Sequence, residues 1–147
     1  MKNYSNIFSP TDKNLKVIYG GSVNIKNCSK ILKNHGIAAL PTETVYGLAG
    51  NAYSNRAVTK IYSLKKRPKK NPLIVHFDNL QSILKETEQN PYLEKLYRKF
   101  SPGPITYVLK LKKKSKISKK LINKNGTIAC RVPVSYTHLT LPTICSV

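Results

Sequence analysis

The chain has 147 residues, 40% of them hydrophobic, which fits one globular domain with a core of its own. It contains neither the ~20-residue apolar run of a membrane span nor the apolar stretch of a secretory signal, so we expect a cytoplasmic protein without a membrane partner. Three cysteines, Cys28, Cys130 and Cys145, show no metal-ligand spacing, which argues against disulfides and zinc.

The formal net charge of +20 is the strongest signal in the composition, because such a charge attracts polyanions such as nucleotides, tRNA or anionic lipid. Lysine far outnumbers arginine, however, as it does in the product of an AT-rich gene. We therefore interpret the basic run from Lys110 to Lys120 as a solvated connector, with a nucleic-acid surface as the alternative.

Strands and helices alternate from the N-terminus onward. The apolar run Leu15 to Tyr19 predicts a strand, and Ser22 is a candidate cap for a helix that ends at Gly36. Residues 37–41 read as a buried strand that proline terminates. Ser54 is a candidate cap for the next helix, because apolar residues follow it at helical spacing.

The second half of the chain continues the alternation. A strand is predicted over 72–77, helices near 80–88 and 91–100, and strands over 105–111 and 127–132. This order indicates an α/β domain in which helices cover a sheet, with mixed strand directions left open.

The segment "LPTETVYGLAGNAY", residues 40–53, is rich in hydroxyls and follows a predicted buried strand. Thr42, Thr44 and Tyr46 could contact a polar ligand, and Gly47 and Gly50 permit close approach of the backbone. A capping turn with Tyr46 in the core explains the same residues equally well.

The stretch "SLKKRPKKNPLIVHF" adds cations next to a predicted strand. Lys65 and Arg67 stand where a helix ends before Pro68, so both charges could point into one cleft and hold a carboxylate or phosphate. Asn71 and His76 flank the strand. The alternatives are a solvated helix end for the cations and a core position for His76.

Four motifs in succession, "LPTETVYGL", "LKKRPKKNPLIVHF", "SPGPITYVL" and "TIACRVP", resemble those of the YrdC/Sua5 family, the threonylcarbamoyl-AMP synthases. The resemblance covers roughly residues 34–133. It implies a YrdC-like twisted mixed α/β sheet flanked by helices, with a basic concave cavity. It also implies a nucleotidyltransferase that forms L-threonylcarbamoyladenylate and pyrophosphate from L-threonine, bicarbonate and ATP, the first step towards N6-threonylcarbamoyladenosine at position 37 of tRNA.

The resemblance also assigns roles to individual residues. It implies that Lys65 and Arg67 are catalytic and bind ATP together with Asn71 and Thr127, and that Thr42, His76 and Arg131 bind L-threonine. Mg²⁺ is expected to accompany ATP without a cluster of protein ligands. The implied partners are a threonylcarbamoyl transferase complex and tRNA. An RNA-binding module of the same fold without catalysis is the alternative, and a carbamoyl-transfer domain of hydrogenase-maturation proteins is a weaker one.

The last residues differ from the rest, since Val134 to Val147 contain no Lys, Arg, Asp or Glu. Val134 to Thr143 match the in-frame translation of a transposon-end adaptor used in sequencing libraries, and the family's Ser-x-Asn motif does not occur after Pro133. We therefore expect residues 1–133 to be a partial YrdC-like domain lacking its C-terminal part and residues 134–147 to be a non-native tail. The alternative is a genuine final strand over "THLTL", residues 137–141. Such a truncated chain is expected to be weakly active or inactive.

Overall fold

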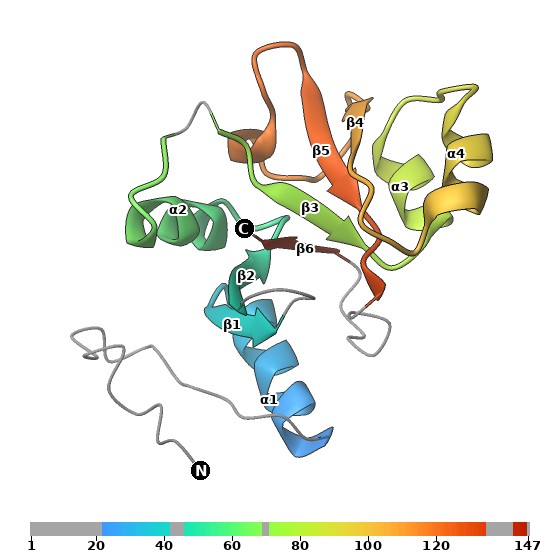
Figure 1. Cartoon of the computed structure of the whole chain (residues 1–147). Helices are drawn as coiled ribbons and strands as arrows, with labels where there is room; N and C mark the ends of the chain where they lie inside the picture. Colours follow the sequence, from blue (N-terminus) through green and yellow to red (C-terminus); the bar gives the residue numbers. More distant parts are fainter. Residues whose placement is uncertain (1–21, 42–45, 69–70, 135–142, 147) are drawn as a thin grey trace.

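The computed structural model describes residues 22–41, 46–68, 71–134 and 143–146, and these form one mixed sheet with helices packed around it (Figure 1). The helices are α1 (Ser22–Lys33), α2 (Asn55–Leu64), α3 (Leu80–Glu86) and α4 (Leu93–Phe100), with a short 3₁₀ turn η1 (Lys119–Leu121). The strands are β1 (Ile37–Pro41), β2 (Tyr46–Asn51), β3 (Ile74–Phe77), β4 (Tyr107–Lys110), β5 (Thr127–Arg131) and β6 (Thr143–Ser146). The strand predicted over 15–19 lies outside the described residues.

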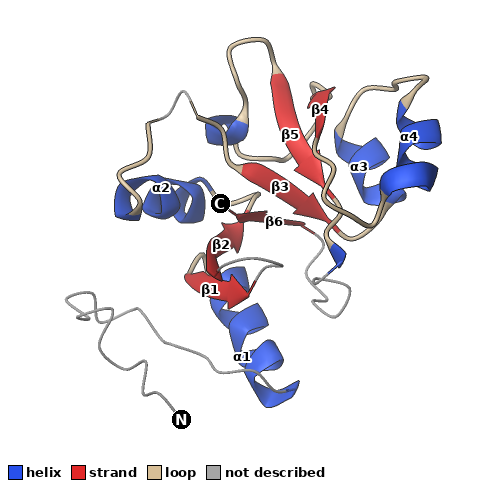
Figure 2. Ribbon diagram, viewed as in Figure 1, coloured by secondary structure: helices blue, strands red, loops and turns tan. Residues whose placement is uncertain are grey.

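The strands follow the order β1-β2-β6-β3-β5-β4, and only β3 and β5 run parallel (Figure 2). The α/β class with mixed strand directions is therefore confirmed. All predicted helices that fall in the described residues are present, and α1 includes Ser22 as its first residue instead of beginning after it. None of the described helices has the length and apolar character needed to cross a membrane.

Two strands were not predicted. Strand β2 lies within the hydroxyl-rich segment and pairs antiparallel with β1, from Ile37 opposite Gly50 to Pro41 opposite Tyr46. Gly47 and Gly50 weaken its strand propensity, which explains why local sequence does not reveal it. Gly50 is also closely packed, because a Cβ atom there would lie 3.1 Å from the Ile61 side chain and 3.2 Å from Ala57.

The second is β6, which comes from the charge-free tail and joins β2 to β3 in the middle of the sheet. Strand pairing uses main-chain N–H and C=O groups that nearly every sequence carries, so this pairing is compatible with a native or an adaptor-derived tail. The division into residues 1–133 and a foreign tail thus stays a prediction.

The helix ends follow local chemistry. The Ser54 hydroxyl accepts a hydrogen bond from the Ala57 amide at 3.2 Å, which confirms it as the cap of α2. At the other end Lys66 adopts a left-handed conformation (φ 48°), and the amide of Arg67 donates to the Tyr62 carbonyl at 3.1 Å. This Schellman arrangement ends α2 without a glycine.

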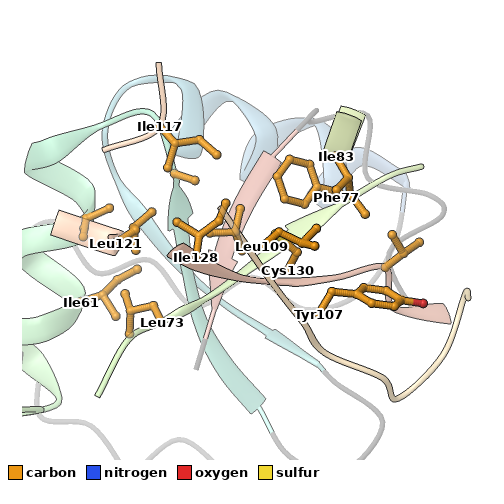
Figure 3. Close-up of a cluster of buried hydrophobic side chains, with 14 of the residues drawn as sticks. Ile61, Leu73, Phe77, Ile83, Tyr107, Leu109, Ile117, Leu121, Ile128 and Cys130 are labelled. Carbon is orange, nitrogen blue, oxygen red and sulfur yellow. The ribbon is translucent and has the colours of Figure 1, made fainter. Parts of the chain in front are cut away.

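The core lies on one face of β3, β4 and β5 (Figure 3), and the side chains of β4 and β5 alternate between buried and more exposed positions. Val75 and Phe77 of β3 and Ile128 and Cys130 of β5 are buried. Helices and loops cover them with further buried side chains, among them Ile61, Ile83, Leu93, Ile117 and Leu121. Burial raises the pKa of the Cys130 thiol to about 12, so this cysteine is a packing residue.

The basic run at 110–120 is a connector with an anchored centre. Ile117 and Ser118 are buried, and the Ser118 amide donates to the Ala52 carbonyl at 2.9 Å. The buried Glu86 carboxylate accepts hydrogen bonds from the hydroxyls of Tyr53 and Ser115, which ties the connector to α3 and to the end of β2. The neighbouring lysines 113, 114, 116, 119 and 120 are exposed.

Candidate functional site

His76 and Arg131 lie side by side at the carboxyl ends of the two parallel strands. They are register partners in the β3–β5 pair, so their side chains leave the same face of the sheet. This face, opposite to the core, also carries Thr127, Ala129 and Ile74, and we call it the open face. Two residues that lie 55 positions apart in the sequence therefore meet at the carboxyl ends of two neighbouring strands, where ligands commonly bind.

The electrostatics of this pair favour binding of an anion. His76 is only 8% exposed, and its burial together with the nearby Arg131 charge lowers its pKa from 6.5 to about 4. The imidazole is therefore neutral at physiological pH and the guanidinium carries the local positive charge. Such a pair can hold a carboxylate with the arginine and a hydroxyl or amine with the histidine.

The guanidinium of Arg131 has a defined orientation. Its Nε donates a hydrogen bond to the Gly103 carbonyl at 3.1 Å, and the Gly103 amide donates to the Val132 carbonyl at 2.9 Å. The loop that contains Gly103 is buried at this residue and follows α4. Sequence reasoning assigned no role to Gly103; its position between Pro102 and Pro104 was the signal that could have drawn attention to it.

Lys65, Arg67 and Asn71 form a second group at the opposite end of β3. Lys65 caps α2 and is exposed, and the left-handed turn at Lys66 separates it from Arg67. Arg67 donates from Nε to the Asn71 carbonyl at 3.1 Å and from Nη2 to the Pro72 carbonyl at 3.2 Å. In this conformation Arg67 thus holds the segment that leads into β3 and places Asn71 beside it.

Thr127 begins β5, at the end of the strand away from Arg131. Its hydroxyl accepts a hydrogen bond from the Asn123 side-chain amide, and its backbone amide donates to the Asn123 side chain at 3.0 Å. Thr42, with neighbouring Glu43, lies outside the described residues, directly after the end of β1.

The structure therefore brings His76 together with Arg131, and Arg67 together with Asn71. Thr127 is at the amino end of β5, level with the residues just before β3. Within the described parts of the chain, no group of three or more His, Cys, Asp or Glu side chains could hold a metal ion.

Comparison with known protein families gives one family model, Sua5/YciO/YrdC, described as "Telomere recombination", which matches residues 30–146. A threonylcarbamoyl-AMP synthase from Pyrococcus abyssi is 37% identical over 121 residues, covering 80% of this chain and 34% of that protein. A threonylcarbamoyl-AMP synthase from Bacillus subtilis is 38% identical over 110 residues, covering 74% of this chain and 32% of that protein. The chain thus spans about a third of the length of these curated relatives.

Solved structures agree with the sequence comparison. Sua5 from P. abyssi, complexed with L-threonine, superposes with a TM-score of 0.78 at 28% identity, over 90% of this chain and 41% of that one. YciO from Escherichia coli has a TM-score of 0.74 at 20% identity, over 90% of this chain and 66% of that one. At this identity the comparison shows a similar fold.

Proposed function

Because the chain belongs to the Sua5/YciO/YrdC family, we propose that it is the synthase part of a threonylcarbamoyl-AMP synthase. Its substrates would be L-threonine, bicarbonate and ATP, and its products threonylcarbamoyl-adenylate and pyrophosphate, which makes it a nucleotidyltransferase. The observation that carries the proposal is the His76–Arg131 pair on the open face, since it offers one fixed cation and one neutral imidazole to an amino acid.

The reaction explains why such residues are needed. The threonine amine combines with bicarbonate to a carbamate, with loss of water. A carbamate oxygen then attacks the α-phosphorus of ATP, and pyrophosphate leaves. The carbamate and the triphosphate repel one another, so cations must hold them in line, and positioning supplies much of the rate. Arg131 binds the threonine carboxylate. His76 and Thr42 bind the rest of the amino acid. Lys65 and Arg67 bind the phosphates.

Arg67 has two tasks in this proposal. Its contacts to the carbonyls of Asn71 and Pro72 place Asn71 near the nucleotide, so Arg67 contributes through the loop as well as by charge. Thr127, bonded to Asn123 at the same end of β5, is proposed as a further ATP contact. Loss of Arg67 should therefore weaken ATP binding more than its charge alone would.

Mg²⁺ belongs to the proposal as a companion of ATP. When bound with ATP, it would neutralise part of the phosphate charge during transfer. We propose that this Mg²⁺ is held mainly by phosphate oxygens and water, because Mg²⁺ in nucleotide sites keeps several waters.

The proposed product would pass to a threonylcarbamoyl transferase complex for modification of tRNA in the cytoplasm. The comparisons favour this synthase over an RNA-binding module of the same fold, because the curated relatives are named for the synthase reaction.

Pyrophosphate release tests the proposal. It should be measured on this chain and on a chimera in which Pro133 is followed by the corresponding C-terminal part of the B. subtilis relative. We expect release that requires both threonine and bicarbonate in the chimera, and weak or no release from the 147-residue chain. A chimera that folds cooperatively but releases no pyrophosphate would overturn the proposal.

Variants of the chimera locate the chemistry. Lys65→Ala and Arg67→Ala should each lower the rate at least about tenfold, because a charge-assisted hydrogen bond contributes about 1.5–3 kcal/mol. Lys85→Ala, at an exposed lysine in the last turn of α3, is the matched control and should leave the rate unchanged. Full activity in both site variants would assign this pair to a solvated helix end.

A further inference from the structure

Gly103 contacts the end of β5 twice. Its amide donates to the Val132 carbonyl at 2.9 Å, and its own carbonyl accepts the hydrogen bond from Arg131 Nε at 3.1 Å. One residue thus binds the main chain on one side of Arg131 and the guanidinium itself. Because Nε–H is fixed, the plane of the guanidinium is fixed as well, and so is the direction of its two-nitrogen edge.

A side chain at this position would disturb both contacts. A Cβ atom on Gly103 would lie 2.5 Å from the Phe100 carbonyl oxygen, which is a backbone atom at the end of α4. The loop would have to shift to relieve this contact. That shift would move the carbonyl which Arg131 uses.

The loop is itself anchored at its start. The Ser101 amide donates to the Tyr97 carbonyl at 2.9 Å, and the hydroxyls of Ser101 and Tyr107 are hydrogen-bonded at 2.7 Å. Tyr107 is buried and pairs with Cys130 in the sheet, so the anchor belongs to the core. The position of Gly103 is therefore set by α4 and β4 together.

We propose that Gly103 is a positioning residue, which orients Arg131 so that its guanidinium meets the carboxylate of the bound amino acid. The inference rests on the proposed function for the identity of that ligand. The contacts of Gly103 with Arg131 and Val132 hold this orientation whatever the ligand is.

Two measurements test this, the first on the 147-residue chain and the second on the chimera of the previous subsection. The first is hydrogen exchange of the Arg131 Nε–H, followed by NMR in the wild type and in Gly103→Ala, without any ligand. The second is the dissociation constant for L-threonine in a double-mutant cycle of Gly103→Ala with Arg131→Lys, a variant that keeps the charge but lacks the guanidinium.

We expect Gly103→Ala to accelerate exchange at Nε at least about tenfold and to weaken threonine binding about tenfold, with ATP binding unchanged. In the Arg131→Lys background the same substitution should change threonine binding less than twofold. Pro104→Ala, an exposed neighbour in the loop, is the control and should change neither. Ser101→Ala is a second variant for the case that Gly103→Ala does not fold, because it adds no atoms to the loop. It should also accelerate exchange at Nε and weaken threonine binding, by smaller factors than Gly103→Ala.

Unchanged exchange at Nε in both Gly103→Ala and Ser101→Ala would overturn the inference, as would an equal loss of threonine binding in the two Arg131 backgrounds. If exchange accelerates while the wild-type chimera folds but binds no threonine, the orienting contact is confirmed and the proposed function is what fails.

Discussion

Acidification should destabilise this protein through His76. Its pKa is about 4 in the folded chain against 6.5 for an ordinary histidine, because burial and the Arg131 charge disfavour the imidazolium. Between these values the unfolded chain binds more protons than the folded one, so stability falls as the pH falls. Lowering the pH from 7 to 5 should cost about 2 kcal/mol, and the full cost of about 3 kcal/mol is reached only below about pH 4, where the folded state is protonated as well.

The assay is urea unfolding at several pH values between 5 and 7, for the wild type, His76→Gln and His35→Asn. His76→Gln should lose this part of the pH dependence. His35→Asn is the control, because His35 is exposed and has a left-handed backbone (φ 60°) that asparagine tolerates. This variant should keep the full pH dependence of stability. An NMR titration of wild-type His76 that centres near 6.5 instead of about 4 would refute the reasoning, whatever the variants do.

The remaining predictions concern the frame of the site and the tail. Ser54→Ala should destabilise the chain by about 1 kcal/mol in urea unfolding, because the Ala57 amide loses its cap, whereas the exposed Ser63→Ala should have little effect. Leu121→Ala should cost about 2–5 kcal/mol in the same assay, since Leu121 is fully buried, and a loss below 1 kcal/mol would contradict its core position. The genomic reading frame should depart from this sequence at the codon for Val134; a genomic frame that encodes Val134 to Val147 as given would show the tail to be native.

Sequence reasoning recovered the elements that local chemistry determines. The cap at Ser54, the apolar spacing of α2 and the apolar runs of β3 and β5 each specify their own structure over a few residues. It missed β2, because two glycines lower the strand propensity of this segment. The strand forms there because β1 and β6 pair with it on both sides. It also could not predict the left-handed turn at Lys66, because lysine has no preference for that conformation.

The site depended on information that no local pattern contains. His76 and Arg131 were selected separately, but their contact requires the register of β3 against β5, which is set by packing of Val75, Phe77, Ile128 and Cys130 in the core. The same holds for Gly103, whose partners lie more than twenty residues away. Motif resemblance identified the residues, and the fold decided which of them are neighbours.

The separation of the two groups has a consequence for the proposed reaction. Thr127 and Arg131 stand at opposite ends of β5, about 13 Å apart at the rise of an extended strand. If phosphates bind near Arg67 and the threonine carboxylate near Arg131, the carbamate must meet the α-phosphorus over the middle of the open face. The register places Ile74 of β3, Ala129 of β5 and Val108 of β4 there, and all three are apolar. A surface of this kind offers no side-chain hydrogen bonds that would compete with those the substrates make at its two ends.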